Sequence, residues 1–195
     1  MEANEFILRD EGGRVRALLG ISEGEPLLEL YDSNGCPRAA IAEAKGGAVL
    51  TLHDESGTEH LGLHVALDLT GSTRPVPSLT LRDANADVRA SLYLLSDEPH
   101  FCLCDAKATA YISVAVTAFG SWIGLSEQNG RAVNITTMTD GSNVSISDAD
   151  GNKTVIGTEG LASKVKDVLN KTPGKASAAF ISLYGKNEEL LWSAP

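Results

Sequence analysis

The chain alternates apolar and polar residues in short segments, and each segment ends in an acidic residue. An apolar-x-apolar-x-acid pattern recurs seven times: Phe6-x-Leu8-x-Asp10, Leu28-x-Leu30-x-Asp32, Leu50-x-Leu52-x-Asp54, Leu79-x-Leu81-x-Asp83, Phe101-x-Leu103-x-Asp105, Ile123-x-Leu125-x-Glu127 and Val144-x-Ile146-x-Asp148. The acidic positions are separated by 22, 22, 29, 22, 22 and 21 residues. Alternation with a period of two is typical of a half-exposed β-strand. The spacing predicts a tandem array of about 22-residue units, with a seven-residue insertion inside the segment 68–77.

Each unit also carries the sequence of a tight turn. An acidic residue stands first and a glycine fourth in most units, as in Asp32-Ser-Asn-Gly35. A type I turn favours Asp at its first position, and glycine at the fourth accepts a left-handed conformation. Ala86 and Ala108 replace that glycine, so their turns are expected to be looser or strained. The residues that we assign to structural turns are Asp10, Gly13, Asp32, Gly35, Asp54, Gly57, Asp83, Glu127, Gly130, Asp148 and Gly151.

A second alternating segment follows each turn, so every unit is predicted to be a β-hairpin. Arg16, Arg38 and Arg89 precede three of these second segments at matching positions. If pairing continues without interruption from a turn that places Asp54 opposite Thr58, Leu52 lies opposite His60. The apolar rows of the two strands would then point to opposite faces. Both faces would need partial cover, most simply from other chains.

The C-terminal part departs from the regular spacing. A decayed eighth unit begins with Ile181-x-Leu183-x-Gly185, after a 15-residue insertion. Thr158 is a candidate cap for a short helix over 159–169, which Pro173-Gly174 ends. We therefore divide the chain into a β-hairpin repeat array over 1–157 and a helical insert plus closing hairpin over 158–195, within the same domain.

The predicted fold class is all-β, with seven hairpin repeats, a decayed eighth and one short helix. It contains 14 to 16 strands, whereas open twisted sheets rarely exceed about ten strands. We therefore expect a curled or oligomeric sheet. A β-solenoid and an intertwined trimeric β-spiral remain alternatives, because the period suits either.

The composition of the chain argues against some classes of binding partner. The 195 residues carry 16 Lys+Arg and 26 Asp+Glu, a net charge of −10. This charge argues against binding to nucleic acid phosphates or to an anionic membrane surface. No apolar stretch approaches the roughly 18 residues of a membrane helix, and the first residues lack a signal-peptide pattern. The expected location is cytoplasmic, or outside the cell after release without a cleaved signal peptide, with no membrane insertion.

We find no sequence motif for catalysis, a cofactor or a metal. His60 and His64 have the spacing of a helical zinc site, but in a strand they would lie about 13 Å apart. Asp148-x-Asp150-x-Asn152 resembles the start of a calcium loop, yet it occupies a turn position of the repeat. Cys102 and Cys104 are expected to share one face of a strand as small, half-buried side chains. The sequence therefore predicts no catalytic, cofactor or metal residues, and a protein that is not an enzyme.

The unit, written L-x-D-x-x-G-x-x-R-A-x-L, resembles a group of uncharacterised bacterial β-repeat proteins. Their chains often end in W-x-A-P, as Trp192-Ser-Ala-Pro195 does here. The likeness is closest over 6–44 and 79–94, whereas Tyr111 and Val133 stand where two units would carry arginine. It implies no enzymatic activity. The two-strand unit is also similar in architecture to the shafts of trimeric viral fibres.

These observations predict a non-enzymatic structural or scaffold protein that assembles with itself, as a homo-oligomer or polymer, because repeat arrays present long periodic surfaces. The alternative is a recognition or adhesin-like binding module for a carbohydrate or a cell-surface target. Trp122, beside Phe119 in an irregular unit, is the candidate binding residue for that alternative. An aromatic ring that fills a gap in the core is the favoured explanation of Trp122.

Overall fold

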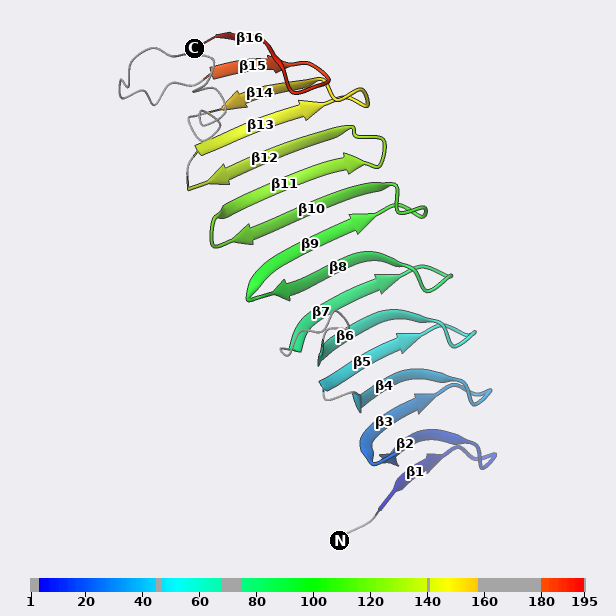
Figure 1. The fold of residues 1–195 in the computed structure, drawn as a ribbon. Coiled ribbons are helices and arrows are strands. Elements are labelled where there is room, and N and C mark those ends of the chain that lie inside the picture. The colour runs from blue at the N-terminus through cyan, green and yellow to red at the C-terminus, as the bar shows by residue number, and fades with distance from the viewer. Residues whose placement is uncertain (1–3, 45–46, 68–74, 140, 158–179, 195) are drawn as a thin grey trace. The chain divides into compact units, whose positions relative to one another are not determined.

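A computed structural model describes residues 4–44, 47–67, 75–139, 141–157 and 180–194 of the chain. Its contacts divide the chain into two compact units, Met1–Asp97 and Glu98–Pro195, called unit 1 and unit 2 below. The repeat pattern gives no sign of this division, because the 22-residue spacing from Asp83 to Asp105 runs across it. Each unit is an antiparallel sheet of consecutive hairpins in chain order (Figure 1).

Unit 1 contains eight strands in its described residues. They are β1 (Phe6–Arg9), β2 (Val15–Ser22), β3 (Glu25–Tyr31), β4 (Pro37–Ala44), β5 (Gly47–His53), β6 (Glu59–Leu67), β7 (Pro75–Arg82) and β8 (Val88–Leu95). Every strand pairs with its neighbours in the sequence. The turns that contain the repeated acidic residue therefore all lie at the same end of the strands (Figure 1).

Unit 2 repeats this arrangement, also with eight strands in its described residues. They are β9 (Glu98–Cys104), β10 (Ala110–Thr117), β11 (Gly120–Glu127), β12 (Ala132–Met138), β13 (Gly141–Ser147), β14 (Lys153–Gly157), β15 (Phe180–Tyr184) and β16 (Leu190–Ala194). The closing hairpin of β15 and β16 is the eighth repeat that the sequence suggests.

The predicted all-β array of two-strand units is confirmed, and it is a hairpin meander. Neither unit is closed or strongly curled, so the expected curling is wrong within each unit. The β-solenoid alternative is also wrong, because strands are joined by antiparallel hairpins. No helix occurs in the part of the chain that the structure describes, and the helix predicted over 159–169 lies outside that part.

The predicted register of the hairpins is wrong by one residue. In the hairpin of β5 and β6, His53 lies opposite Glu59, but Leu52 lies opposite Leu61 rather than His60. His60 is the additional residue of a β-bulge. Because side chains alternate between faces, one extra residue moves every later side chain of β6 to the other face. The apolar residues of both strands therefore share one face.

The same one-residue shift from the predicted register occurs in most hairpins. Three other hairpins of unit 1 have their bulges at Arg16, Arg38 and Arg89, and the hairpin of β15 and β16 has its bulge at Leu191. The turn itself takes up the extra residue between β9 and β10, where the Asp105 N–H donates to the carbonyl of Ala110, five residues later.

The hairpin of β11 and β12 has the predicted register and no bulge. Its apolar residue Val133 comes six residues after Glu127 and pairs directly with Leu125. In the hairpin of β5 and β6, by contrast, Leu61 comes seven residues after Asp54. The missing bulge residue accounts for the repeat spacing of 21 residues that follows Glu127.

No second layer of secondary structure covers either sheet within the described residues. The face opposite the apolar rows, called the mixed face, has glycines that neighbouring side chains cover. A Cβ atom added at Gly62 would collide with the ring of His64, and one added at Gly124 would lie 2.7 Å from the ring of Trp122. The most buried side chains, including Ala115 and Val155 at 1% exposure, lie on this face.

Deleting Arg38 should be far more harmful than truncating it. The deletion removes the bulge and turns Ala39 and Ile41 away from the apolar rows, for an expected loss of about 2 kcal/mol or more. Arg38→Ala keeps the residue count, so its loss should be clearly smaller. Urea unfolding of both variants measures the difference, and equal losses would contradict the assigned role of the bulge.

Candidate functional site

The most prominent feature of unit 1 is a continuous apolar face, made of two rows of residues that pair from strand to strand. The first row, from β1 to β8, is Phe6, Leu19, Leu28, Ile41, Leu50, Leu63, Leu79 and Leu92. The second row is Leu8, Ala17, Leu30, Ala39, Leu52, Leu61, Leu81 and Ala90.

Unit 2 carries an equivalent apolar face. Its first row, from β9 to β16, is Phe101, Val114, Ile123, Ile135, Val144, Ile156, Ile181 and Ala194. Its second row is Leu103, Ile112, Leu125, Val133, Ile146, Thr154, Leu183 and Trp192. Of the 32 positions in the four rows of eight, all but Thr154 are apolar, and none is charged.

The apolar face is open to solvent. Ile41 is 51% exposed in unit 1, and Ile146 is 52% exposed in unit 2. Eight strands spaced about 4.8 Å apart, with two rows of residues each extending about 6.6 Å along the strands, present about 500 Å² per unit. An apolar patch of this size on a soluble chain usually marks an interaction surface.

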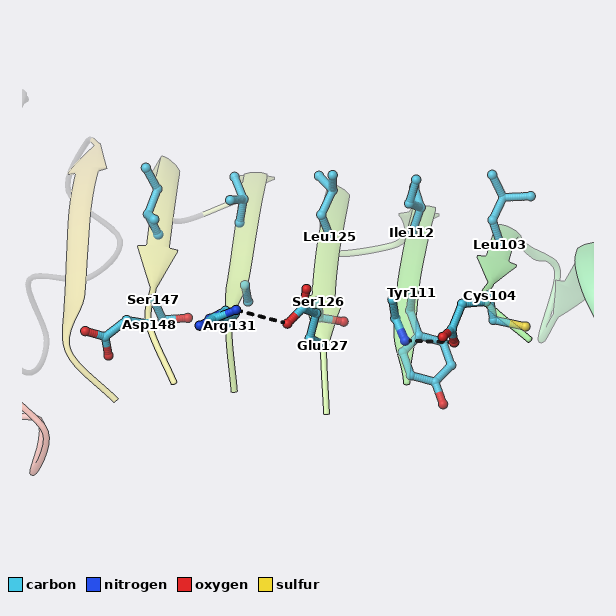
Figure 2. Close-up of a pocket in the computed structure, with 15 residues that line it drawn as sticks. Leu103, Cys104, Tyr111, Ile112, Leu125, Ser126, Glu127, Arg131, Ser147 and Asp148 are labelled. Carbon is cyan, nitrogen blue, oxygen red and sulfur yellow. Dashed lines mark hydrogen bonds and ion pairs between the residues drawn. The ribbon is translucent and has the colours of Figure 1, made fainter. Parts of the chain in front are cut away.

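The apolar face is not smooth. In unit 2 a hollow of about 550 Å³ lies over the second row, with Leu103, Ile112 and Leu125 side by side (Figure 2). Nearer the turns, Glu127 and Arg131 lie at its border, with an ion pair of 3.8 Å between them (Figure 2). In unit 1 a hollow of about 390 Å³ lies among residues that include Leu19, Leu28 and Ile41.

The repeated aspartates organise the turns at the ends of the strands. In the hairpin of β3 and β4, the Asp32 carboxylate accepts hydrogen bonds from the N–H groups of Asn34 (2.8 Å) and Cys36 (3.0 Å). These bonds, the one from Cys36 above all, lower the pKa of Asp32. The equivalent backbone bond from Ala110, with the hydroxyl of Thr109, lowers the pKa of Asp105 to about 2. The carboxylates of Asp32 and Asp105 are therefore held in their charged form by the turns that they close.

In unit 1 the bulge residue is also a cation that reaches the turn aspartate of its own hairpin. The four pairs are Arg16–Asp10 at 3.6 Å, Arg38–Asp32 at 3.7 Å, His60–Asp54 at 2.9 Å and Arg89–Asp83 at 2.6 Å. One residue thus corrects the register and bridges the hairpin. In unit 2 the bulge between β15 and β16 carries Leu191, which cannot form this bridge.

His60 differs from the arginines that occupy the same position. Its Nε2 lies 2.9 Å from the Asp54 carboxylate, and its Nδ1 lies 3.0 Å from the carbonyl of Arg82. Both partners can only accept, so a doubly protonated ring satisfies both contacts. The hydrogen bond to Asp54 accordingly raises the pKa of His60, while bonds from Ser56 and His60 lower the pKa of Asp54.

The residues considered for other chemistry are dispersed in the structure. No group of three or more metal-ligating side chains occurs among the described residues. His64 approaches Glu59 at 3.6 Å, whereas His60 binds Asp54. Cys36, Cys102 and Cys104 form no disulfide bond with one another. No helix of the described chain is long and apolar enough to cross a membrane.

The two tryptophans lie on opposite faces of unit 2. Trp122 is half-buried on the mixed face, where its ring covers Gly124. Trp192 lies in the second apolar row opposite Leu183 and is 50% exposed, while Phe119 in a turn is 72% exposed.

The repeat pattern contains the residues of the apolar face, but the register expected from the sequence places them on two faces. The cations at matching positions before the second strands were the available signal of a bulge.

The comparisons with known proteins add no relative. No protein-family model matches this chain, and no curated protein matches it. The resemblance to bacterial β-repeat proteins therefore stays a prediction.

Replacing Ala86 by glycine should stabilise unit 1. Ala86 has a φ of 64°, and its N–H donates to the Asp83 carbonyl at 3.0 Å. A left-handed conformation costs an alanine about 1–2 kcal/mol, and the greater freedom of unfolded glycine offsets about half of this. We expect Ala86→Gly to gain about 0.5–1 kcal/mol in urea unfolding. Gly57→Ala, at a φ of 84° with nothing near its new Cβ, should lose a similar amount.

Replacing His60 by arginine should change how stability depends on pH. Because the pKa of His60 is raised in the folded state, its bridge contributes fully below its ordinary pKa of 6.5. The contribution is lost as the pH rises through the higher folded value. Arginine stays charged throughout this range. The urea midpoint of the natural chain should therefore fall more between pH 6 and pH 9 than that of His60→Arg, and parallel curves would contradict this account.

Proposed function

We propose that this chain is a non-enzymatic structural protein that assembles with itself. The observation that supports the proposal is the apolar face, on which 31 of 32 positions are apolar and most of the large side chains are between 38% and 63% exposed. Burial of such a surface is the dominant favourable contribution to protein association. The proposed function therefore rests on an apolar face that each unit carries across its eight described strands, and not on a cluster of reactive groups.

The extent of the face suits an assembly. Specific protein interfaces bury about 800 Å² from each partner. The two apolar rows present about 500 Å² in each unit, so partners that cover the faces of both units would bury about 1,000 Å². Each repeat adds an equal increment, which is how a repeat array reaches an interface of this size with short, similar units.

In this proposal the acidic residues stabilise the turns and keep free copies apart, and they take no part in the apolar face. The seven turn acids recur with the repeat, and their carboxylates accept hydrogen bonds from their own turns, as Asp54 does from Ser56 and Thr58. They lie at the strand ends and outside the apolar rows. The net charge of −10 keeps free copies apart in solution until the apolar faces meet.

Light scattering after size exclusion tests the proposal, together with a pair of adjacent substitutions. The natural chain should have a mass above the 20.5 kDa of one copy. Ile41→Lys places a charge in the first apolar row, and should shift the mass toward a single copy because the charge would be buried in the interface. Ala40→Lys is the matched control, since Ala40 lies on the mixed face of the same strand.

The two variants must behave differently. Ala40→Lys should keep the mass of the natural chain, and both variants should keep its circular dichroism spectrum. A single copy of 20.5 kDa at every concentration of the natural chain would refute self-assembly. If Ile41→Lys leaves the assembly intact, the apolar face is not the interface between copies.

A further inference from the structure

We infer that two copies of this chain pack apolar face to apolar face, as the two sheets of a β-sandwich. This inference rests on the proposed function and adds to it the surface and the kind of partner. Two sheets whose inner faces are apolar pack about 10 Å apart, with strands within about 30° of each other. The partner that fits is therefore a second sheet of the same kind.

The regularity of the face makes it complementary to itself. Its rows repeat at the strand spacing in one direction and at every second residue in the other. A twofold axis that lies between the two sheets, parallel to them, brings the apolar rows of two copies together, and twofold symmetry is the commonest symmetry of homodimers. The hollows, of 390 Å³ over unit 1 and 550 Å³ over unit 2, offer space for side chains of the opposing sheet.

The distribution of charge favours this partner over an anionic lipid surface. Charged groups occur on the mixed face, where Glu29 lies, and at the turns, where the pairs Arg89–Asp83 and Arg82–Glu59 form. Face-to-face packing leaves these groups in water. An anionic membrane would instead meet the aspartates that line the strand ends. Glu43 is the charged residue of the row beyond the two apolar rows, which also contains Ala48, Val65 and Pro77.

Packing through faces also explains the apolar rows better than growth through strand edges. Pairing at an edge satisfies backbone N–H and C=O groups but leaves the face of each sheet in contact with water. Side chains such as Leu63, 46% exposed, and Ile135, 45% exposed, would then stay uncovered. Only an occupant of the face itself buries them.

The two natural tryptophans provide the test, because they lie on opposite faces of unit 2 and are the only two in the chain. Trp122→Phe leaves Trp192 as the reporter of the apolar face, and Trp192→Phe leaves Trp122 as the reporter of the mixed face. Acrylamide quenching of each variant is measured in the assembled state and in the presence of Ile41→Lys, which supplies the single-copy reference. The mass of every sample is measured in parallel.

Face-to-face packing predicts that quenching of Trp192 falls severalfold on assembly and that its emission shifts to shorter wavelength. Quenching of Trp122 should stay nearly constant. An assembly in which Trp192 stays as accessible as in the single copy would overturn this inference and leave self-assembly intact. If the natural chain is a single copy throughout, the proposed function fails as well, and the mass measurement separates the two outcomes.

Discussion

The alternation of side chains along a β-strand is the constraint on which this molecule depends. In a hairpin, the number of residues between paired positions decides whether the apolar residues of the two strands share a face. In the hairpin of β5 and β6, an uninterrupted ladder would separate Leu52 and Leu61, and the bulge at His60 brings them together. The same one-residue correction, repeated along unit 1, converts a series of alternating strands into a sheet with an apolar side.

The bulge and the turn are coupled electrostatically in unit 1. The residue that is inserted for the register is a cation, and it lies beside the carboxylate that closes the turn, as Arg89 does beside Asp83. That carboxylate also accepts hydrogen bonds from backbone N–H groups of the turn, which hold it in place and favour its charged form. In these four hairpins of unit 1, the turn, the bulge and the ion pair therefore stabilise one another.

The assembly that we propose follows from the exposure of the apolar face, which no second layer covers within the described residues. A single layer has no second layer to cover its apolar side, and most free energy of folding comes from such cover. On the mixed face the chain supplies cover locally, as when Trp122 lies over Gly124. On the apolar face most of the large side chains are between 38% and 63% exposed within the described chain, and a second sheet would bury them.

The sequence by itself determined the strands, the turns and the repeat, because these depend on alternation, on Asp and Gly at set turn positions, and on spacing. It also contained every residue of the apolar face. Only the tertiary structure decided that these residues lie on one side, because a β-bulge changes the face of a strand without changing its composition. Arg16, Arg38 and Arg89 stood at matching positions in the sequence, yet their effect on the register is visible only once both strands are paired.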